Sequence, residues 1–274
     1  GVSIVNGCQT VTSLYDLYTQ SKLENGVDIL TRIIEISDYN ERMKITEYLN
    51  SQNPIKDSYF IANHTIIRDL QKSLENKGYY LERQINEFEY KKHYGGKGFN
   101  NLVPIKLESV IQHYVGYWLD DYASTAKRGK GLLFDKNKID EILMDINADR
   151  VIEANNMYDK ISKIITSYRR TRRNEKKTEI SDFLGMSHSD FLNKIDEYLF
   201  MNTGDIVILN TTKLLKDKYT NKNTQFDDEK LIKDAILLIH KNIIDNYPDG
   251  VRNISALTKN TKLFKEIKQF IDNL

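Results

Sequence analysis

A short polar stretch near the amino terminus has the residue types of an anion-binding turn. It runs from Asn6 to Thr10 with the letters NGCQT, after the apolar Val2–Val5. A strand, a tight turn and a helix in succession leave backbone N–H groups pointing outward, and the helix N-terminus adds partial positive charge. We therefore predict a phosphate-binding corner with Thr10 as the helix N-cap; an ordinary capped turn is the alternative. The residues expected to contact the ligand there are Asn6, Gly7, Gln9 and Thr10.

Two later polar pairs are candidates for the same pocket. Glu82 and Arg83 follow two tyrosines, and the arginine can hold a phosphate through two N–H groups while the glutamate orients it. A surface ion pair at a strand edge is the alternative. Gln52 and Asn53 precede Pro54, so they are expected either as polar groups facing the ligand or as the turn that ends a helix.

Two clusters of cationic residues are candidates for contact with DNA or RNA. The first lies in a glycine-containing loop, and the second ends a predicted helix. They predict contacts to the phosphate backbone without base specificity. The alternative is a solvated helix end whose cations are stabilised by the helix dipole. The residues concerned are Lys127, Arg128 and Lys130 in the loop, and Arg169, Arg170, Arg172 and Arg173 on the helix.

Catalytic patterns are weak in this sequence. Glu89-Tyr90-Lys91 matches the end of an Asp…Glu-x-Lys nuclease pattern, for which Asp69 and Glu87 are the conceivable metal-binding partners. Cys8 lies within the polar turn, either as a nucleophile activated by the helix N-terminus or as a small apolar filler. No two histidines share helical i,i+3 or i,i+4 spacing, so we expect no zinc site. No catalytic residue and no cofactor is assigned.

The composition limits the classes of partner. The 274 residues include 40 Lys and Arg against 39 Asp and Glu, so contact with nucleic acid must come from a local cluster of charge. A single cysteine excludes an intrachain disulfide and favours a reducing cytoplasm. No apolar run approaches the ~20 residues that span a bilayer, so no membrane contact is expected. The expected partners are DNA, RNA or a nucleotide, with a partner protein or a second copy of the chain as the alternative.

The elements that would position these residues divide the chain in two. We predict an α+β or α/β domain with a small sheet over residues 1–147, followed by a mainly α-helical domain over residues 148–274. Expected strands cover Ile29–Ile36, Tyr79–Gln84 and Phe88–Lys91. Expected helices cover Asp57–Lys77, which Gly78 terminates, and then Val151–Tyr168, Ser189–Phe200, Asp228–Asp245 and Lys262–Leu274.

Several motifs in the first half resemble those of the abortive infection phage resistance family, often abbreviated AIPR. They occur in the order that the family shows and cover roughly Gly1 to Leu143. The two most specific are the runs Ile4–Leu14 and Asn50–Ile55. The other matching runs are Thr31–Glu35, Ala62-Asn63, Gly78–Arg83, Ala123–Lys127 and Leu132–Phe134. Ser or Thr stands where relatives have Pro in the run that ends at Lys127.

The resemblance implies an antiviral role in bacterial defence. Relatives carry an Asn-Asn-Gly-Ile segment before the first motif, and this chain starts abruptly at Gly1, so we expect an N-terminal part to be missing. The first motif is also similar, more distantly, to the Asp-Gly-Gln-His-Arg motif of DNA-modification-linked proteins. The hypothesis is a cytoplasmic phage-defence protein that binds a phosphate-bearing ligand. The alternatives are a non-catalytic interaction module with a basic helical arm and a metal-dependent nuclease.

Overall fold

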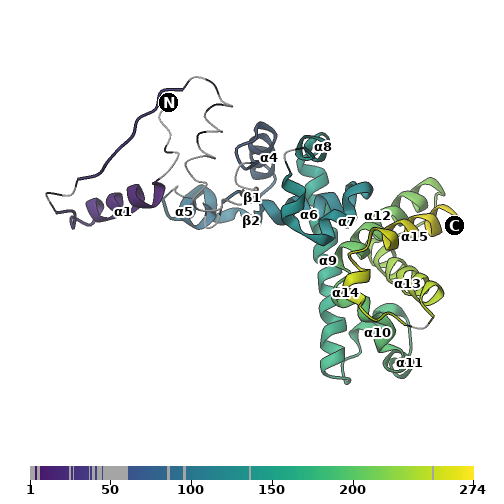
Figure 1. The fold of residues 1–274 in the computed structure, drawn as a ribbon. Helices are drawn as coiled ribbons and strands as arrows, with labels where there is room; N and C mark the ends of the chain where they lie inside the picture. The colour runs from purple at the N-terminus through teal and green to yellow at the C-terminus, as the bar shows by residue number, and fades with distance from the viewer. Residues whose placement is uncertain are drawn as a thin grey trace.

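Helices form most of the described chain. The computed structural model describes residues 4, 7–24, 26, 28–36, 38, 41, 45, 61–84, 87–94, 97–135, 137–248 and 250–274. One parallel two-stranded sheet lies in the N-terminal part, and the C-terminal part is mostly helical (Figure 1). The predicted fold class is therefore confirmed.

The small sheet is built on a helix that ends at a glycine. Helix α4 (Thr65–Glu75) buries one apolar stripe, and Gly78 takes a positive φ of 85° that lets the chain turn into β1 (Tyr79–Glu82). Strand β1 pairs in parallel with β2 (Val103–Lys106). The connection between the strands holds α5 (Glu87–Tyr94) and the 3₁₀ helix η1 (Lys97–Asn101). A crossover of this kind is what parallel strands require.

One central helix organises the rest of the chain. Helix α12 (Asp205–Asn221) is buried on all sides over Ile206–Thr212, and it contacts α6 (Leu107–Trp118), α7 (Asp120–Arg128) and α9 (Ala148–Arg173). A helix that is apolar all round belongs inside a protein. The buried hydroxyl groups of α12 bond back to carbonyls of the preceding turn, so their burial leaves no unpaired donor.

The remaining helices surround α12 and the far end of α9. On the C-terminal side α12 packs on α13 (Asp228–Asn246) and α15 (Thr261–Asp272), whereas α10 (Glu179–Leu184) packs on α9. Shorter elements complete the order: η2 (Lys130–Phe134), α8 (Ile139–Leu143), α11 (His188–Asn193), the 3₁₀ helix η3 (Ile195–Asn202) and α14 (Ile254–Leu257).

A single apolar cluster extends from Ile61 to Ile271 and so includes residues from both predicted domains. The predicted boundary falls at Asn147, whose side chain caps α9 by accepting the Arg150 N–H at 3.0 Å. The domain division itself stays a prediction. Within the described residues, no helix combines the length and the apolar character needed to cross a bilayer.

Two of the strands expected from the sequence are wrong. Residues 88–91 belong to α5 rather than to a strand, because acidic residues in its first turn and basic residues in its last turn suit the helix dipole. Residues 28–36 form no strand, and Leu30 and Ile33 are almost fully exposed there. Their β-branched sequence is typical of strands, but a strand needs a partner and these residues have none in the described chain.

The helix expected over Asp57–Lys77 is shorter in its described part. It begins at Thr65, because the His64 side chain accepts the Ile66 N–H and so caps α4. The other expected helices are close to those observed, although Ser189–Phe200 divides into most of α11 and most of η3. Of the strand expected over Val2–Val5, only Ile4 is described; it is exposed and outside any strand.

The close approach of α6 and α12 gives a test of the packing. A Cβ on Gly116 would lie 3.0 Å from Ile206 Cγ2 and 3.4 Å from Leu209 Cδ2, so a larger side chain forces the two helices apart. We expect Gly116→Val to lower the free energy of unfolding by about 1–3 kcal/mol, as overpacking does. Urea unfolding followed by circular dichroism measures this. Gly131→Ala is the control, because its Cβ would meet nothing within 4 Å; equal stabilities for both variants would contradict the packing described here.

Candidate anion-binding site

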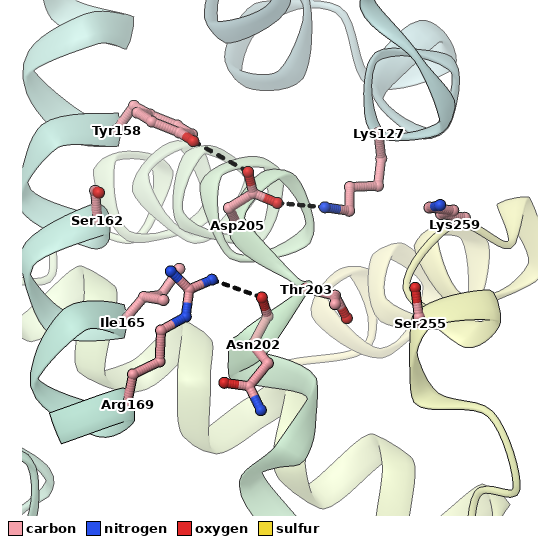
Figure 2. A pocket seen from close by; sticks show the side chains of 10 residues that line it. All are labelled: Lys127, Tyr158, Ser162, Ile165, Arg169, Asn202, Thr203, Asp205, Ser255 and Lys259. Atoms are coloured by element: carbon pink, nitrogen blue, oxygen red, sulfur yellow. Dashed lines mark hydrogen bonds and ion pairs between the residues drawn. The ribbon is translucent and has the colours of Figure 1, made fainter. Parts of the chain in front are cut away.

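A cavity of about 360 Å³ lies where α7, α9, the start of α12 and the α14 region meet. In Figure 2, the side chains of Tyr158, Lys127 and Arg169 extend from α9 and α7 toward the junction of η3 and α12, and Ser255 and Lys259 lie on the side opposite α9. The volume of the cavity is at the lower end of the range for small-ligand sites. The residues that line it are Lys127, Tyr158, Ser162, Ile165, Arg169, Asn202, Thr203, Asp205, Ser255 and Lys259.

Helical spacing places one wall of the cavity. Tyr158, Ser162, Ile165 and Arg169 are spaced by four, three and four residues along α9, so they lie on one face of the helix. Ile165 is buried and fixes this face against the core, while Arg169 is exposed. The opposite wall comes from the junction of η3 and α12 and from residues in and just after α14.

The cavity is rich in positive charge. Lys127, Arg169 and Lys259 are cationic, and Asp205 is the one acidic residue among the residues that line the cavity. Arg169 Nη2 donates a hydrogen bond to the Asn202 carbonyl at 2.7 Å, which anchors the guanidinium and leaves further N–H groups for a ligand. Lys259 is exposed and forms no ion pair with any residue that the structure describes. The arrangement therefore favours an anion.

The carboxylate of Asp205 ties two helices to the start of α12. Its Oδ1 lies 2.5 Å from Lys127 Nζ, and its Oδ2 accepts the Tyr158 hydroxyl at 3.1 Å (Figure 2). Burial and the negative charge of Asp205 raise the pKa of Tyr158 well above its usual value, so the phenol stays protonated. Tyr158 is therefore a hydrogen-bond donor to Asp205 and is unsuited to act as a phenolate nucleophile.

A buried histidine, His113, packs against the ring of Tyr158. The rings of His113 and Tyr158 stack with centroids 3.7 Å apart, and His113 Nδ1 lies 2.6 Å from Asn155 Oδ1. Burial lowers the pKa of His113, and this effect outweighs the hydrogen bond with Asn155. A neutral imidazole therefore packs against the ring that forms the cavity wall.

The structure brings together two residues from the separate basic clusters. Lys127 of the loop cluster and Arg169 of the helix cluster both line the cavity. The other eight residues that line the cavity, Tyr158, Asp205 and Lys259 among them, are not predicted from the sequence as site residues. The spacing along α9 includes Tyr158, but no sequence signal places Asp205 or Lys259 next to that helix.

The other residues of the two clusters lie outside this cavity. Arg128 donates to Thr125 Oγ1 at 3.0 Å, and Lys130 donates to Ser109 Oγ at 2.9 Å. Arg172 pairs with Asp196 at 3.2 Å. Arg170 and Arg173 are exposed at the end of α9. Their contact with nucleic acid stays a prediction.

A second cavity of about 530 Å³ lies beside η2 and is lined by Thr125, Arg128, Lys138 and Asp135, among other residues. It contains one residue of the predicted basic clusters, whereas the cavity at Asp205 contains residues of both. We take the cavity at Asp205 as the candidate site for this reason.

The predicted phosphate clamp is already engaged within the protein. Arg83 Nη1 donates to the Ala62 carbonyl at 3.0 Å, and its Nη2 lies 3.3 Å from Glu87 Oε1. Burial tends to raise the pKa of Glu87, but the hydrogen bond from the Arg83 amide and the charges of Arg83 and Lys91 hold that pKa below its usual value. Glu87, rather than the predicted Glu82, therefore orients Arg83; Glu82 is half-buried at the end of β1.

The predicted N-terminal corner is described only in part. Gly7 has a φ of 83° and serves as the N-cap of α1 (Cys8–Thr19), so Thr10 lies inside the first turn instead of capping it. Gly7, Gln9 and Thr10 are exposed. Asn6, Gln52 and Asn53 lie outside the described residues. Anion binding at this corner stays a prediction.

The residues of the nuclease pattern do not form one site in the described chain. Lys91 lies 3.3 Å from Glu87 within α5, while Glu89 and Asp69 are exposed. Among the residues that the structure describes, no three His, Cys, Asp or Glu side chains are grouped to hold a metal ion.

A family model described as AIPR protein matches residues 1–273, which is nearly the whole chain. No curated protein and no solved structure matches the chain.

The pKa of His113 gives a test of how the cavity wall is supported. The imidazole has a lower pKa in the folded chain than its ordinary 6.5. Its burial in neutral form therefore contributes stability above that pH, and this contribution is lost as the pH falls through 6.5 toward the folded pKa. Gln at this position cannot be protonated, so the stability advantage of the wild type over His113→Gln should shrink from about pH 8 to about pH 5.5. Urea unfolding at each pH measures the difference in the free energy of unfolding between the two proteins. A difference that grows toward acid pH would show that the imidazole is charged in the folded chain and would contradict the prediction.

Proposed function

Since the chain belongs to the AIPR family of abortive infection phage resistance proteins, we propose that it acts in phage defence by binding a phosphate-bearing ligand in the cavity at Asp205. The ligand is a nucleotide or a nucleic acid. The proposal assigns binding, and it assigns no catalytic step. The alternatives of a protein-docking module and a metal-dependent nuclease stay predictions.

The observation that carries this proposal is the convergence of cations. Lys127 and Arg169 are far apart in the sequence and belong to different helices, and Lys259 comes from a third region. Among the residues that line the cavity, only Asp205 offers a carboxylate, and it pairs with Lys127. Three cations around one acid leave excess positive charge that an anion can neutralise.

The geometry suits a phosphate group in particular. The planar guanidinium of Arg169 is held by the Asn202 carbonyl, so it is already ordered when a ligand arrives. Guanidinium N–H groups match phosphate oxygens in bidentate fashion. The Lys259 ammonium and the hydroxyl groups of Ser162 and Ser255 can donate to the remaining oxygens.

Removal of the two unpaired cations tests the site. We expect Arg169→Gln and Lys259→Gln each to weaken the binding of pyrophosphate and ATP about tenfold, because each loses a charge-assisted hydrogen bond. Isothermal titration calorimetry measures the affinities. Lys72→Gln, which removes one positive charge from the exposed face of α4, is the control. Identical affinities for all three variants would show that pyrophosphate and ATP do not bind in this cavity.

The acidic residue of the cavity gives a test of opposite sign. Asp205 neutralises Lys127 and repels any anion nearby. We expect Asp205→Asn to strengthen pyrophosphate binding several-fold while lowering thermal stability, because the lysine and Tyr158 lose their charged partner. The same calorimetry, with a melting curve on each sample, checks both effects. Weaker binding by a folded Asp205→Asn protein would contradict the proposed electrostatics.

A further inference from the structure

We infer that the ligand of this cavity is a single polynucleotide strand whose sugar-phosphate backbone leaves the cavity along α9 and passes Arg173. The inference rests on the proposed function, because it starts from a phosphate bound beside Arg169.

Helical geometry continues the cationic wall of the cavity. Arg173 follows Arg169 by four residues in α9, so it lies on the same face about 6 Å further along the axis. This step is similar to the distance between neighbouring phosphates in an extended strand. Figure 1 shows α9 running on toward α10 and α11 beyond the level of the cavity elements. One strand can therefore place one phosphate in the cavity and the next beside Arg173.

The neighbouring arginines differ in whether their charge is already neutralised. Arg172 pairs with Asp196 of η3 at 3.2 Å. Arg173 is exposed and forms no ion pair with any residue of the described chain. The dipole of α9 explains why cations are tolerated at its C-terminal end. It does not provide a counter-charge for Arg173, which a phosphate of the ligand would provide.

The size of the cavity selects a single strand. A volume of about 360 Å³ holds one nucleotide-sized group, and a duplex is too wide to enter it. Tyr158 is the one aromatic side chain that lines the cavity, and His113 already stacks on its ring. The cavity therefore offers no row of stacking platforms for successive bases, and the contacts are to the backbone without base specificity.

Oligonucleotides of increasing length test this inference on the intact protein. We would measure fluorescence anisotropy with thymidylate chains of one to about eight nucleotides, and with matched uridylate chains to compare DNA with RNA. The affinity should rise at least tenfold between the mononucleotide and the short oligomers. Arg173→Gln should abolish most of this gain and leave mononucleotide binding unchanged. It should also reduce the dependence of log affinity on log salt by about 0.7, the value for one phosphate contact on a single strand.

Arg172→Gln is the matched control. It removes the same charge from the neighbouring residue, whose side chain Asp196 already neutralises. It should retain the gain in affinity with length. An equal loss in both variants would overturn the path along α9 and indicate a diffuse effect of charge. If the affinity does not depend on length while the mononucleotide still binds through Arg169, the inference of a polynucleotide ligand is wrong and the proposed function is unaffected. Absence of binding by mononucleotide, oligomer and pyrophosphate alike would overturn both.

Discussion

The carboxylate of Asp205 is the point at which three helices of this protein meet. It lies at the first residue of α12 and contacts Lys127 of α7 and Tyr158 of α9. A carboxylate at a helix N-terminus is favoured by the helix dipole, so α12 itself helps to hold the charge there. The partners are half-buried, and each uses a hydrogen bond to a charged group, which is stronger than a neutral one. The shape of the cavity depends on this junction.

The same junction explains why the cavity stays positive. Asp205 can neutralise one lysine, and it is held by Lys127 on one oxygen and by Tyr158 on the other. Arg169 is satisfied in part by a neutral carbonyl, and Lys259 extends from the far wall. The protein as a whole is nearly neutral, so this excess is local. A local excess of charge acts at short range and is screened by salt, which suits the binding of a phosphate group by direct contact.

Another cluster of charged residues has a structural role. Arg83, Glu87 and Lys91 link the end of β1 to α5 through ion pairs at 3.3 Å, and Arg83 also bonds the Ala62 carbonyl. These side chains are partly buried, so their hydrogen bonds offset the cost of taking charge out of water. An arginine whose donors are committed to its own protein has fewer left for a ligand. Arg169 differs because a single donor is committed to Asn202.

Apolar periodicity and short motifs are enough to predict most of the helices, the strand at Tyr79–Glu82 and the family, whereas the strand at Val103–Lys106 that pairs with it is not predicted. Apolar residues at helical spacing in α9, α13 and α15 are local signals, and so is Gly78, where a positive φ ends a helical segment. The motifs in the first half of the chain predict the family, and the family model confirms it over residues 1–273. The basic clusters were also visible, since each is contiguous in the chain.

Which cations share a cavity and which are neutralised depends on contacts between segments that are far apart in the sequence. Lys127, Arg169 and Lys259 share a cavity because α7 and α9 pack on α12 while α14 packs on η3, and no spacing along the chain encodes these contacts. The same holds for the partners: Glu87 rather than Glu82 holds Arg83, and Asp205 holds Lys127. The strand expected at residues 29–36 shows that a local sequence pattern cannot tell whether a segment finds a pairing partner. Its composition favours β structure, but strand pairing is a long-range interaction, and the described fold gives this segment no partner.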